Sequence, residues 1–99
     1  MQLLIHAPWE VNDAMKDLIE KKVEKLINFQ ENIIKAEVFL KNGEGVSIND
    51  KKVEIRLKTN ASEVFAQDTT DELEKSVANV VEKLRRQLIR QKQKSSPHK

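Results

Sequence analysis

Residues 52–58 read KVEIRLK, and this segment decides the fold class. Val53, Ile55 and Leu57 alternate with charged neighbours along its whole length. Successive side chains of a strand point to opposite faces of a sheet, so the pattern predicts a strand with one apolar and one charged face. The apolar face must be covered, and a layer of helices is the economical cover.

Three further segments are predicted to be strands. Residues 2–6 alternate and end before Pro8, and residues 64–66 form a short strand after a turn at 60–62. A turn with Gly43 and Gly45 follows a strand at about 33–41. In that strand the alternation places four apolar side chains on the buried side: Ile34, Ala36, Val38 and Leu40.

Two amphipathic helices are predicted from apolar residues at helical spacing. The first covers about 13–29, with Asn12 as its N-cap, and the second covers about 70–92. For the second, Thr69 and Glu72 fit a capping box with Thr69 as N-cap. Its apolar arc consists of Leu73, Val77, Val80, Leu84 and Leu88. We expect Phe29 and Phe65 in the core, with Trp9 and Phe39 as the exposed aromatic side chains.

The predicted order is strand, helix, three strands, helix, which is an α+β chain of βαβββα type. The first strand should run parallel to the second through a right-handed connection, and the last three strands should form an antiparallel meander. We therefore expect a four-stranded sheet with two helices packed on one face. Residues 1–94 form a single domain in this prediction, and residues 95–99 form a flexible basic tail.

The C-terminal end of the chain is strongly basic. No acidic residue follows Glu82. Seven basic residues follow it: Lys83, Arg85, Arg86, Arg90, Lys92, Lys94 and Lys99. The net charge of the whole chain is +2, so subtracting these seven charges leaves −5 for the first 82 residues. Such a segment attracts phosphate polymers, anionic membranes or acidic proteins.

A helical wheel sharpens this basic segment. Asn79, Lys83, Arg86 and Arg90 share a stripe well away from the buried arc, with Arg85 and Lys92 on the opposite flank. In the first helix Lys22 falls inside the apolar arc, Lys25 lies beside it and Lys16 lies on the opposite flank. If the helices are neighbours, Lys22 and Lys25 can join the stripe. The plainer alternative is a solvated helix face with a snorkelling lysine.

Several classes of function lack the residues they need. The chain has no cysteine and only two histidines, which excludes the usual metal sites, and it has no glycine-rich phosphate loop. No nucleophile stands with a base, so we expect no enzyme and no cofactor. No segment reads as a signal peptide or a membrane span, so we expect a cytoplasmic protein without a membrane partner or a small-molecule substrate.

Four segments carry a resemblance to a known family: DAMK at 13–16, KVEKL at 22–26, VFA at 64–66 and VEKLRRQLIR at 81–90. They resemble the ribosome hibernation-promoting factors, also called ribosome-associated inhibitors or sigma-factor modulation proteins, over residues 2–94. The resemblance implies the same βαβββα fold. It also implies a protein that binds the small ribosomal subunit and its RNA, covers the messenger and transfer RNA sites, and silences idle ribosomes.

The resemblance further implies which residues face ribosomal RNA. They are Lys16, Lys22, Lys25, Lys83, Arg86 and Arg90, with Asn79 on the same stripe. Asn28 departs from the family pattern, where a basic residue is usual, and Glu74 stands in place of a tyrosine. The layout is that of the short form, which in some bacteria acts with a separate ribosome-dimerising factor.

Two other functions stay open from the residues alone. A general double-stranded RNA-binding domain would have the same outline of two helices on a sheet with a basic edge. A protein-interaction module acting on a transcription factor would use the same charges against an acidic surface. These alternatives differ from the ribosome-binding reading in whether an assembled ribosomal subunit is required.

Overall fold

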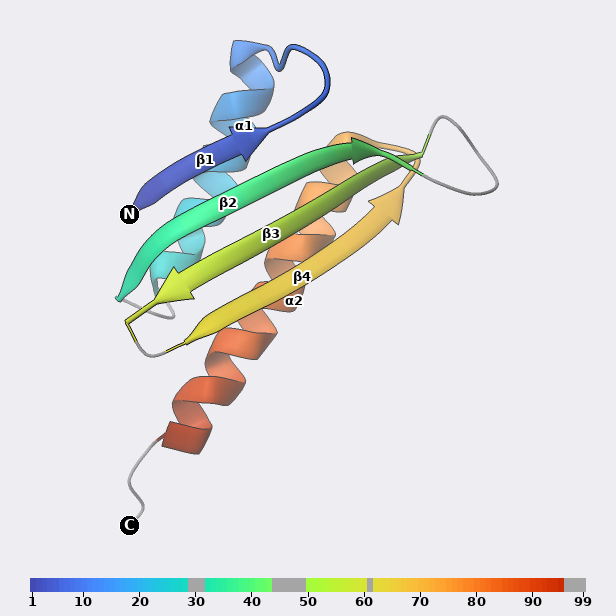
Figure 1. The fold of residues 1–99 in the computed structure, drawn as a ribbon. Coiled ribbons are helices and arrows are strands. Elements are labelled where there is room, and N and C mark those ends of the chain that lie inside the picture. The colour runs from blue at the N-terminus through green and yellow to red at the C-terminus, as the bar shows by residue number, and fades with distance from the viewer. Residues whose placement is uncertain (29–31, 44–49, 61, 96–99) are drawn as a thin grey trace.

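The computed structural model describes residues 1–28, 32–43, 50–60 and 62–95. The elements follow the predicted order: β1 (Gln2–His6), α1 (Asp13–Glu24), the short 3-10 helix η1 (Lys25–Asn28), β2 (Ile33–Asn42), β3 (Lys51–Thr59), β4 (Glu63–Thr70) and α2 (Leu73–Ser95). The strands form one sheet in the order β1-β2-β3-β4. Strand β1 is parallel to β2, and the other neighbours are antiparallel. Both helices lie on the same side of this sheet (Figure 1), so the predicted α+β fold class is confirmed.

The core lies between the sheet and the helices. Val53, Ile55 and Leu57 of β3 have no exposed surface, as their alternation predicts. The predicted arc of α2 is buried from Val77 onward, with Leu84 and Leu88 among the largest fully enclosed side chains, and Leu73 at its start is partly buried. Helix α1 begins after Asn12, whose side chain accepts the backbone N–H of Met15 at 2.8 Å, so this N-cap is confirmed.

A β-bulge at the start of β2 corrects the predicted register. Ile33 pairs with Thr59 and Lys35 with Lys58, which leaves Ile34 as an extra residue on the bulged strand. Ile33 is therefore buried, whereas Ile34, predicted to be buried, is 47% exposed. Beyond the bulge Ala36, Val38 and Leu40 occupy the core as predicted. A bulge adds one residue without changing the apolar character of either isoleucine, so the alternation could not reveal it.

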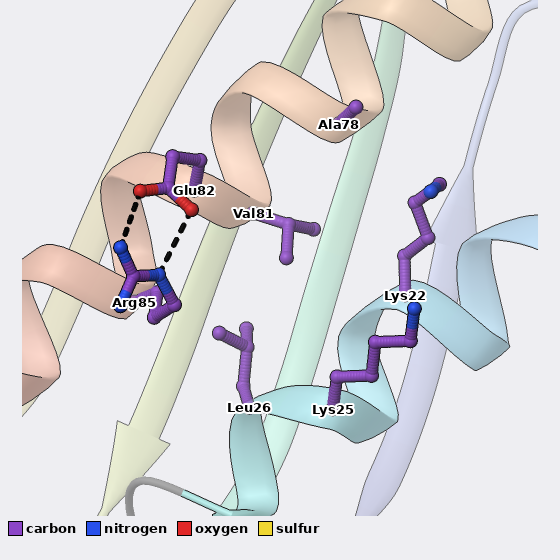
Figure 2. A pocket seen from close by; sticks show the side chains of 7 residues that line it. All are labelled: Lys22, Lys25, Leu26, Ala78, Val81, Glu82 and Arg85. Carbon is purple, nitrogen blue, oxygen red and sulfur yellow. Dashed lines mark hydrogen bonds and ion pairs between the residues drawn. The ribbon is translucent and has the colours of Figure 1, made fainter.

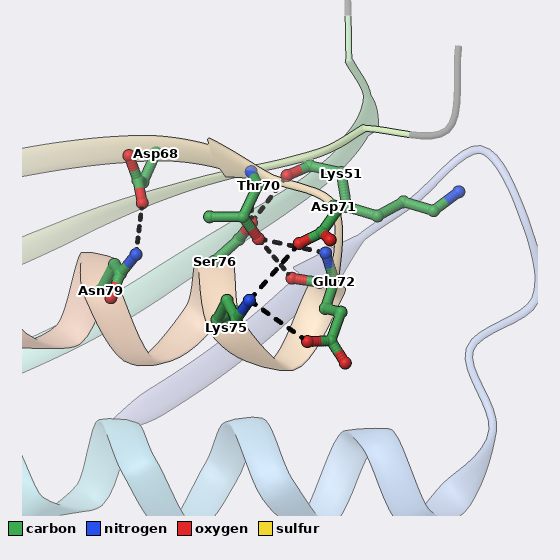
Figure 3. Close-up of polar contacts among 8 residues, drawn as sticks. All are labelled: Lys51, Asp68, Thr70, Asp71, Glu72, Lys75, Ser76 and Asn79. Atoms are coloured by element: carbon green, nitrogen blue, oxygen red, sulfur yellow. Dashed lines mark hydrogen bonds and ion pairs between the residues drawn. The ribbon is translucent and has the colours of Figure 1, made fainter. Parts of the chain in front are cut away.

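The start of α2 is also corrected, because β4 is longer than the predicted segment at 64–66. Its pairing with β3 continues to Thr69 and Thr70, and the helix begins only at Leu73. Thr69 is thus a strand residue and not an N-cap. The buried Ser76 hydroxyl lies 2.7 Å from the carbonyl of Lys51 and 2.8 Å from the Thr70 hydroxyl, and it accepts the N–H of Thr70 at 3.0 Å (Figure 3). This network joins β3, β4 and α2 at one point and holds Thr70 in the sheet.

Two aromatic predictions have different outcomes. Phe65 was predicted to be in the core, but it is 40% exposed, because its neighbours Val64 and Ala66 are the inward-facing residues of β4. Phe29 lies outside the described residues. Residues 96–99 of the predicted tail also lie outside them. Helix α2 itself continues to Ser95, beyond the predicted end at about 92.

The bulge generates a prediction about two adjacent isoleucines. Ile33→Ala should lower the free energy of unfolding by about 2 to 5 kcal/mol, because it leaves a cavity in the core. Ile34→Ala should cost less than about 1 kcal/mol, because the side chain is already half in water. Urea denaturation measures both. The reverse order of the two losses would contradict the bulge.

The Ser76 network generates a second matched pair. Ser76→Ala should lower the free energy of unfolding by about 1 to 3 kcal/mol, because the partners of its buried hydroxyl on β3 and β4 lose a hydrogen bond. Thr69→Ala should cost little, whereas loss of a true N-cap would cost about 1 kcal/mol. Thermal and urea unfolding of the two variants compare these losses. If Thr69→Ala lowered the free energy of unfolding as much as Ser76→Ala, the predicted capping box at Thr69 would be correct after all.

Candidate nucleic-acid interface

The two helices lie side by side and enclose a groove of about 460 Å³. Figure 2 shows Leu26 and Val81 pointing toward one another across it. Lys22 and Lys25 extend from the α1 side, and Arg85 stands on the α2 side with Glu82 and Ala78. The groove thus has an apolar floor, and its rim carries three cations beside Glu82. The cations of the rim can donate hydrogen bonds to a phosphate-bearing partner.

One carboxylate organises the arginines of the rim. Glu82 accepts two hydrogen bonds from Arg85, at 2.8 and 2.6 Å, and a third from Arg86 at 3.1 Å. The hydrogen bonds and charge of Arg85, assisted by Arg86, lower the pKa of Glu82 to about 2. Glu82 therefore stays charged at any physiological pH. It holds one arginine on the groove side of α2 and the next arginine beside it.

The opposite flank of α2 contacts β4. Lys83 donates to the carbonyl of Gln67 at 2.8 Å and lies 3.4 Å from the Asp68 carboxylate. Asn79 donates to the same carboxylate at 2.7 Å (Figure 3). Partial burial raises the pKa of Asp68, but the hydrogen bond from Asn79 and the charge of Lys83 outweigh it and leave that pKa below its ordinary value. Lys83 is half exposed, yet it already has partners that a phosphate would have to replace.

The structure brings together some of the predicted residues and separates others. Lys22 and Lys25 meet α2 on the Arg85 flank, across the helix from Lys83 and Asn79. Arg86 and Arg90 are exposed on the outer surface of α2 between these flanks. Lys16 is exposed, and the wheel places it on the flank of α1 away from the groove. The predicted patch is therefore a band across the outside of the helix layer, with Lys16 apart from it.

Arg85 is the residue that the sequence reasoning left out of the site. Its position depends on which flank of α2 meets α1, and a wheel of one helix does not specify its neighbour. Val81 was the available signal, because it widens the apolar arc of α2 on the Arg85 flank. In the structure Val81 packs against the core and lines the groove. An apolar side chain on one flank thus marks the side where the second helix packs.

The charge of the helix layer changes along α2. At its N-terminal end Lys22 and Ala78 line a second hollow with Glu72, Glu74 and Lys75. Lys75 pairs with both Asp71 and Glu72, at 3.6 and 3.5 Å, and their charges raise the pKa of Lys75 (Figure 3). Glu74, the departure from the family tyrosine, lies at this acidic end. A polyanion would therefore be drawn toward the C-terminal half of α2.

Among the residues that the structure describes, no three histidine, cysteine, aspartate or glutamate side chains gather closely enough to hold a metal ion. In the same ranges no helix is long and apolar enough to cross a lipid bilayer.

Residues 7–96 match the family model described as sigma 54 modulation protein / S30EA ribosomal protein. The chain belongs to this family. Members of the sigma 54 modulation / S30EA family are ribosome-associated factors and not enzymes. This confirms the family that the four segments at 13–16, 22–26, 64–66 and 81–90 suggest.

Two solved structures have a similar fold. The N-terminal domain of Protein Y from Thermus thermophilus is 25% identical, with a TM-score of 0.78, over 91% of this chain and 98% of that one. A ribosomal subunit interface protein from Coxiella burnetii is 22% identical, with a TM-score of 0.83, over 94% of this chain and 99% of that one. A comparison with curated protein sequences gives no match. Both likenesses concern the fold.

The pKa of Glu82 offers a direct test of the arginine arrangement. An NMR titration should give a midpoint near pH 2, and Arg85→Gln should raise it toward the ordinary value of 4.5. Because the pKa is depressed in the folded protein, the ionised pair stabilises it above about pH 4.5, and this contribution is lost as the pH falls toward 2. Arg86→Gln should raise the pKa less. Equal shifts in the two variants would contradict the dominant role of Arg85.

Proposed function

We propose that this protein binds the small ribosomal subunit, occupies the channel for messenger and transfer RNA, and silences idle ribosomes without any chemical step. Membership of a ribosome-associated family supports the choice of the ribosome. The structure of similar fold from Coxiella burnetii is a ribosomal subunit interface protein, which points in the same direction. Inhibition in this proposal is by occupancy, so its strength follows binding.

The observation that carries the proposal is the cationic band on the helix layer. Lys22 and Lys25 stand at the groove, and Arg86 and Arg90 stand on the exposed surface of α2. Phosphate contacts from such side chains supply much of the affinity for RNA and fix the orientation of the protein on it. We assign Asn79 and Lys83 to one edge of this surface. We assign Lys16, which stands apart from the band, to a separate contact with RNA. Lys83 binds phosphate only after leaving Asp68, which exposed pairs do at little cost.

The proposal places the protein in the cytoplasm, where ribosomes are. A separate ribosome-dimerising factor is a candidate partner, by the resemblance to the short family form. Residues 95–99 add Lys99 to the basic end and have no periodic apolar residue, so we assign them to RNA contacts and not to folding.

Sedimentation through sucrose gradients tests the function. The protein should travel with the small subunit and with whole ribosomes, and should bind deproteinised RNA of the same subunit much more weakly. A general double-stranded RNA binder would bind both equally. A module for a transcription factor would stay at the top of the gradient.

A charge-reversal pair tests the surface. Arg86→Glu with Arg90→Glu should weaken ribosome binding at least tenfold, about 1.4 kcal/mol, while the buried leucines keep the fold. Losing two phosphate contacts should also make the log–log salt dependence shallower by roughly 1.4 to 1.8. The matched control, Lys41→Glu with Lys58→Glu, makes the same change in net charge on the open face of the sheet. Similar losses in the two variants would show that the helix band has no special role in ribosome binding and would reject it as the site.

A further inference from the structure

The face of the sheet opposite the helices carries a row of rings that the proposed function does not use. His6, Phe39, Arg56 and Phe65 come from β1, β2, β3 and β4 respectively. Phe39, Arg56 and Phe65 alternate with buried neighbours, and His6 lies between Ile5 and Ala7, which pack against the core, so all four side chains stand on the outer face. One such residue from every strand makes a continuous row across the sheet.

The geometry of the row is that of a stack. The rings of His6 and Phe39 lie with centroids 4.8 Å apart and 15° between their planes. The Arg56 guanidinium lies 5.9 Å from the centre of the Phe39 ring, and the strand register places Arg56 directly opposite Phe65. The side chains of His6 and Arg56 are 50% and 45% exposed, and Phe65 is 40% exposed. The two ends of the row and its cation are therefore open to a flat partner.

The charges around the row favour an anion. On β2, β3 and β4 the outer face carries five cations and three carboxylates, a surplus of two: Lys35, Lys41, Lys52, Arg56 and Lys58 against Glu37, Glu54 and Glu63. Each carboxylate is already paired, Glu37 with Lys35 and His6, Glu54 with Lys41 and Lys52, and Glu63 with Arg56. Lys58 makes no ion pair with any described residue and is free to meet a phosphate.

We propose that this face is a second nucleic-acid surface, which binds a short segment of single-stranded RNA by stacking. Bases would extend the row at Phe65 and at the Arg56 plane, and lysines would meet the phosphates. Four strands spaced about 4.8 Å apart span about 14 Å. The row crosses them obliquely, because Phe39 pairs with Glu54 and Arg56 with Glu37, so it is somewhat longer and suits two or three bases. Rings accept any base on their faces, so binding should show little sequence preference.

A protein partner fits this face less well. The centres of protein–protein interfaces are depleted in charged residues, whereas this row is bordered by ion pairs on every side. Phe65 is 40% exposed, and most of the other outer-face residues of β2, β3 and β4 are polar or charged. Stacking with a base uses such a ring without removing the surrounding charges from water.

Fluorescence anisotropy with a labelled eight-nucleotide uridine strand tests the proposal. The wild-type protein should bind the strand, Phe65→Ala should bind it roughly 5- to 100-fold more weakly, and Phe65→Tyr should bind like the wild type. Arg56→Lys keeps the charge but loses the planar group, so it should also bind several-fold more weakly. Ile27→Ala, which removes an exposed apolar side chain from η1, is the matched control and should have no effect.

The outcome separates this face from the helix band. Phe65→Ala should still sediment with ribosomes. The Arg86→Glu, Arg90→Glu variant should still bind the uridine strand in about 0.3 M salt, where interactions between distant charges are screened. Absence of binding by the wild type, or equal binding by Phe65→Ala, would overturn the proposal and leave ribosome binding untouched. Equal binding by Arg56→Lys would show that only the charge of Arg56 contributes, and this would also overturn the proposal. Circular dichroism confirms that each variant is folded.

Discussion

The packing of α2 on β3 is the contact on which the rest of the molecule depends. Val53, Ile55 and Leu57 lie against the apolar arc of the helix, and they and the arc residues from Val77 to Leu88 have no exposed surface. Once this arc is fixed, the helix has no rotational freedom. Val81 and Arg85 must face α1, while Asn79 and Lys83 must face β4. Apolar packing thus decides where the charges lie, although it carries no charge itself.

Two carboxylates then position the cations that packing has brought to each flank. Glu82 holds Arg85 and Arg86, and Asp68 holds Lys83 with Asn79. Exposed pairs of this kind contribute little to stability and are weakened by salt. A single phosphate gains little by replacing such a carboxylate. A polymer with many phosphates replaces several at once and releases its counterions, so this arrangement favours dense polyanions over small anions.

Much of the fold was predictable because the apolar pattern repeats regularly over long segments. The arc of α2 and the alternation of β3 each involve several consecutive repeats, and tertiary contacts did not displace them. The errors lie where a contact between distant segments decides. The bulge at Ile34 depends on pairing with Thr59 and Lys58, and the true start of α2 depends on Ser76 meeting Lys51. Arg85 was missed for the same reason, since its neighbour α1 lies far away in sequence.

The two proposed surfaces differ in physics and lie on opposite sides of the domain, one on the helix layer and one on the sheet. The helix band acts through charge, which is long in range and sensitive to salt, whereas the ring row acts through contact. Strand β4 belongs to both, because the Phe65 ring stands on the outer face while its carbonyl accepts the side-chain amide of Gln87 from α2 at 2.9 Å. Lys83 and Gln87 also cover backbone carbonyls of this edge strand, which makes it a poor template for pairing with another chain. RNA bound to either surface therefore lies near β4, and contacts from the opposite face help to hold this strand in place.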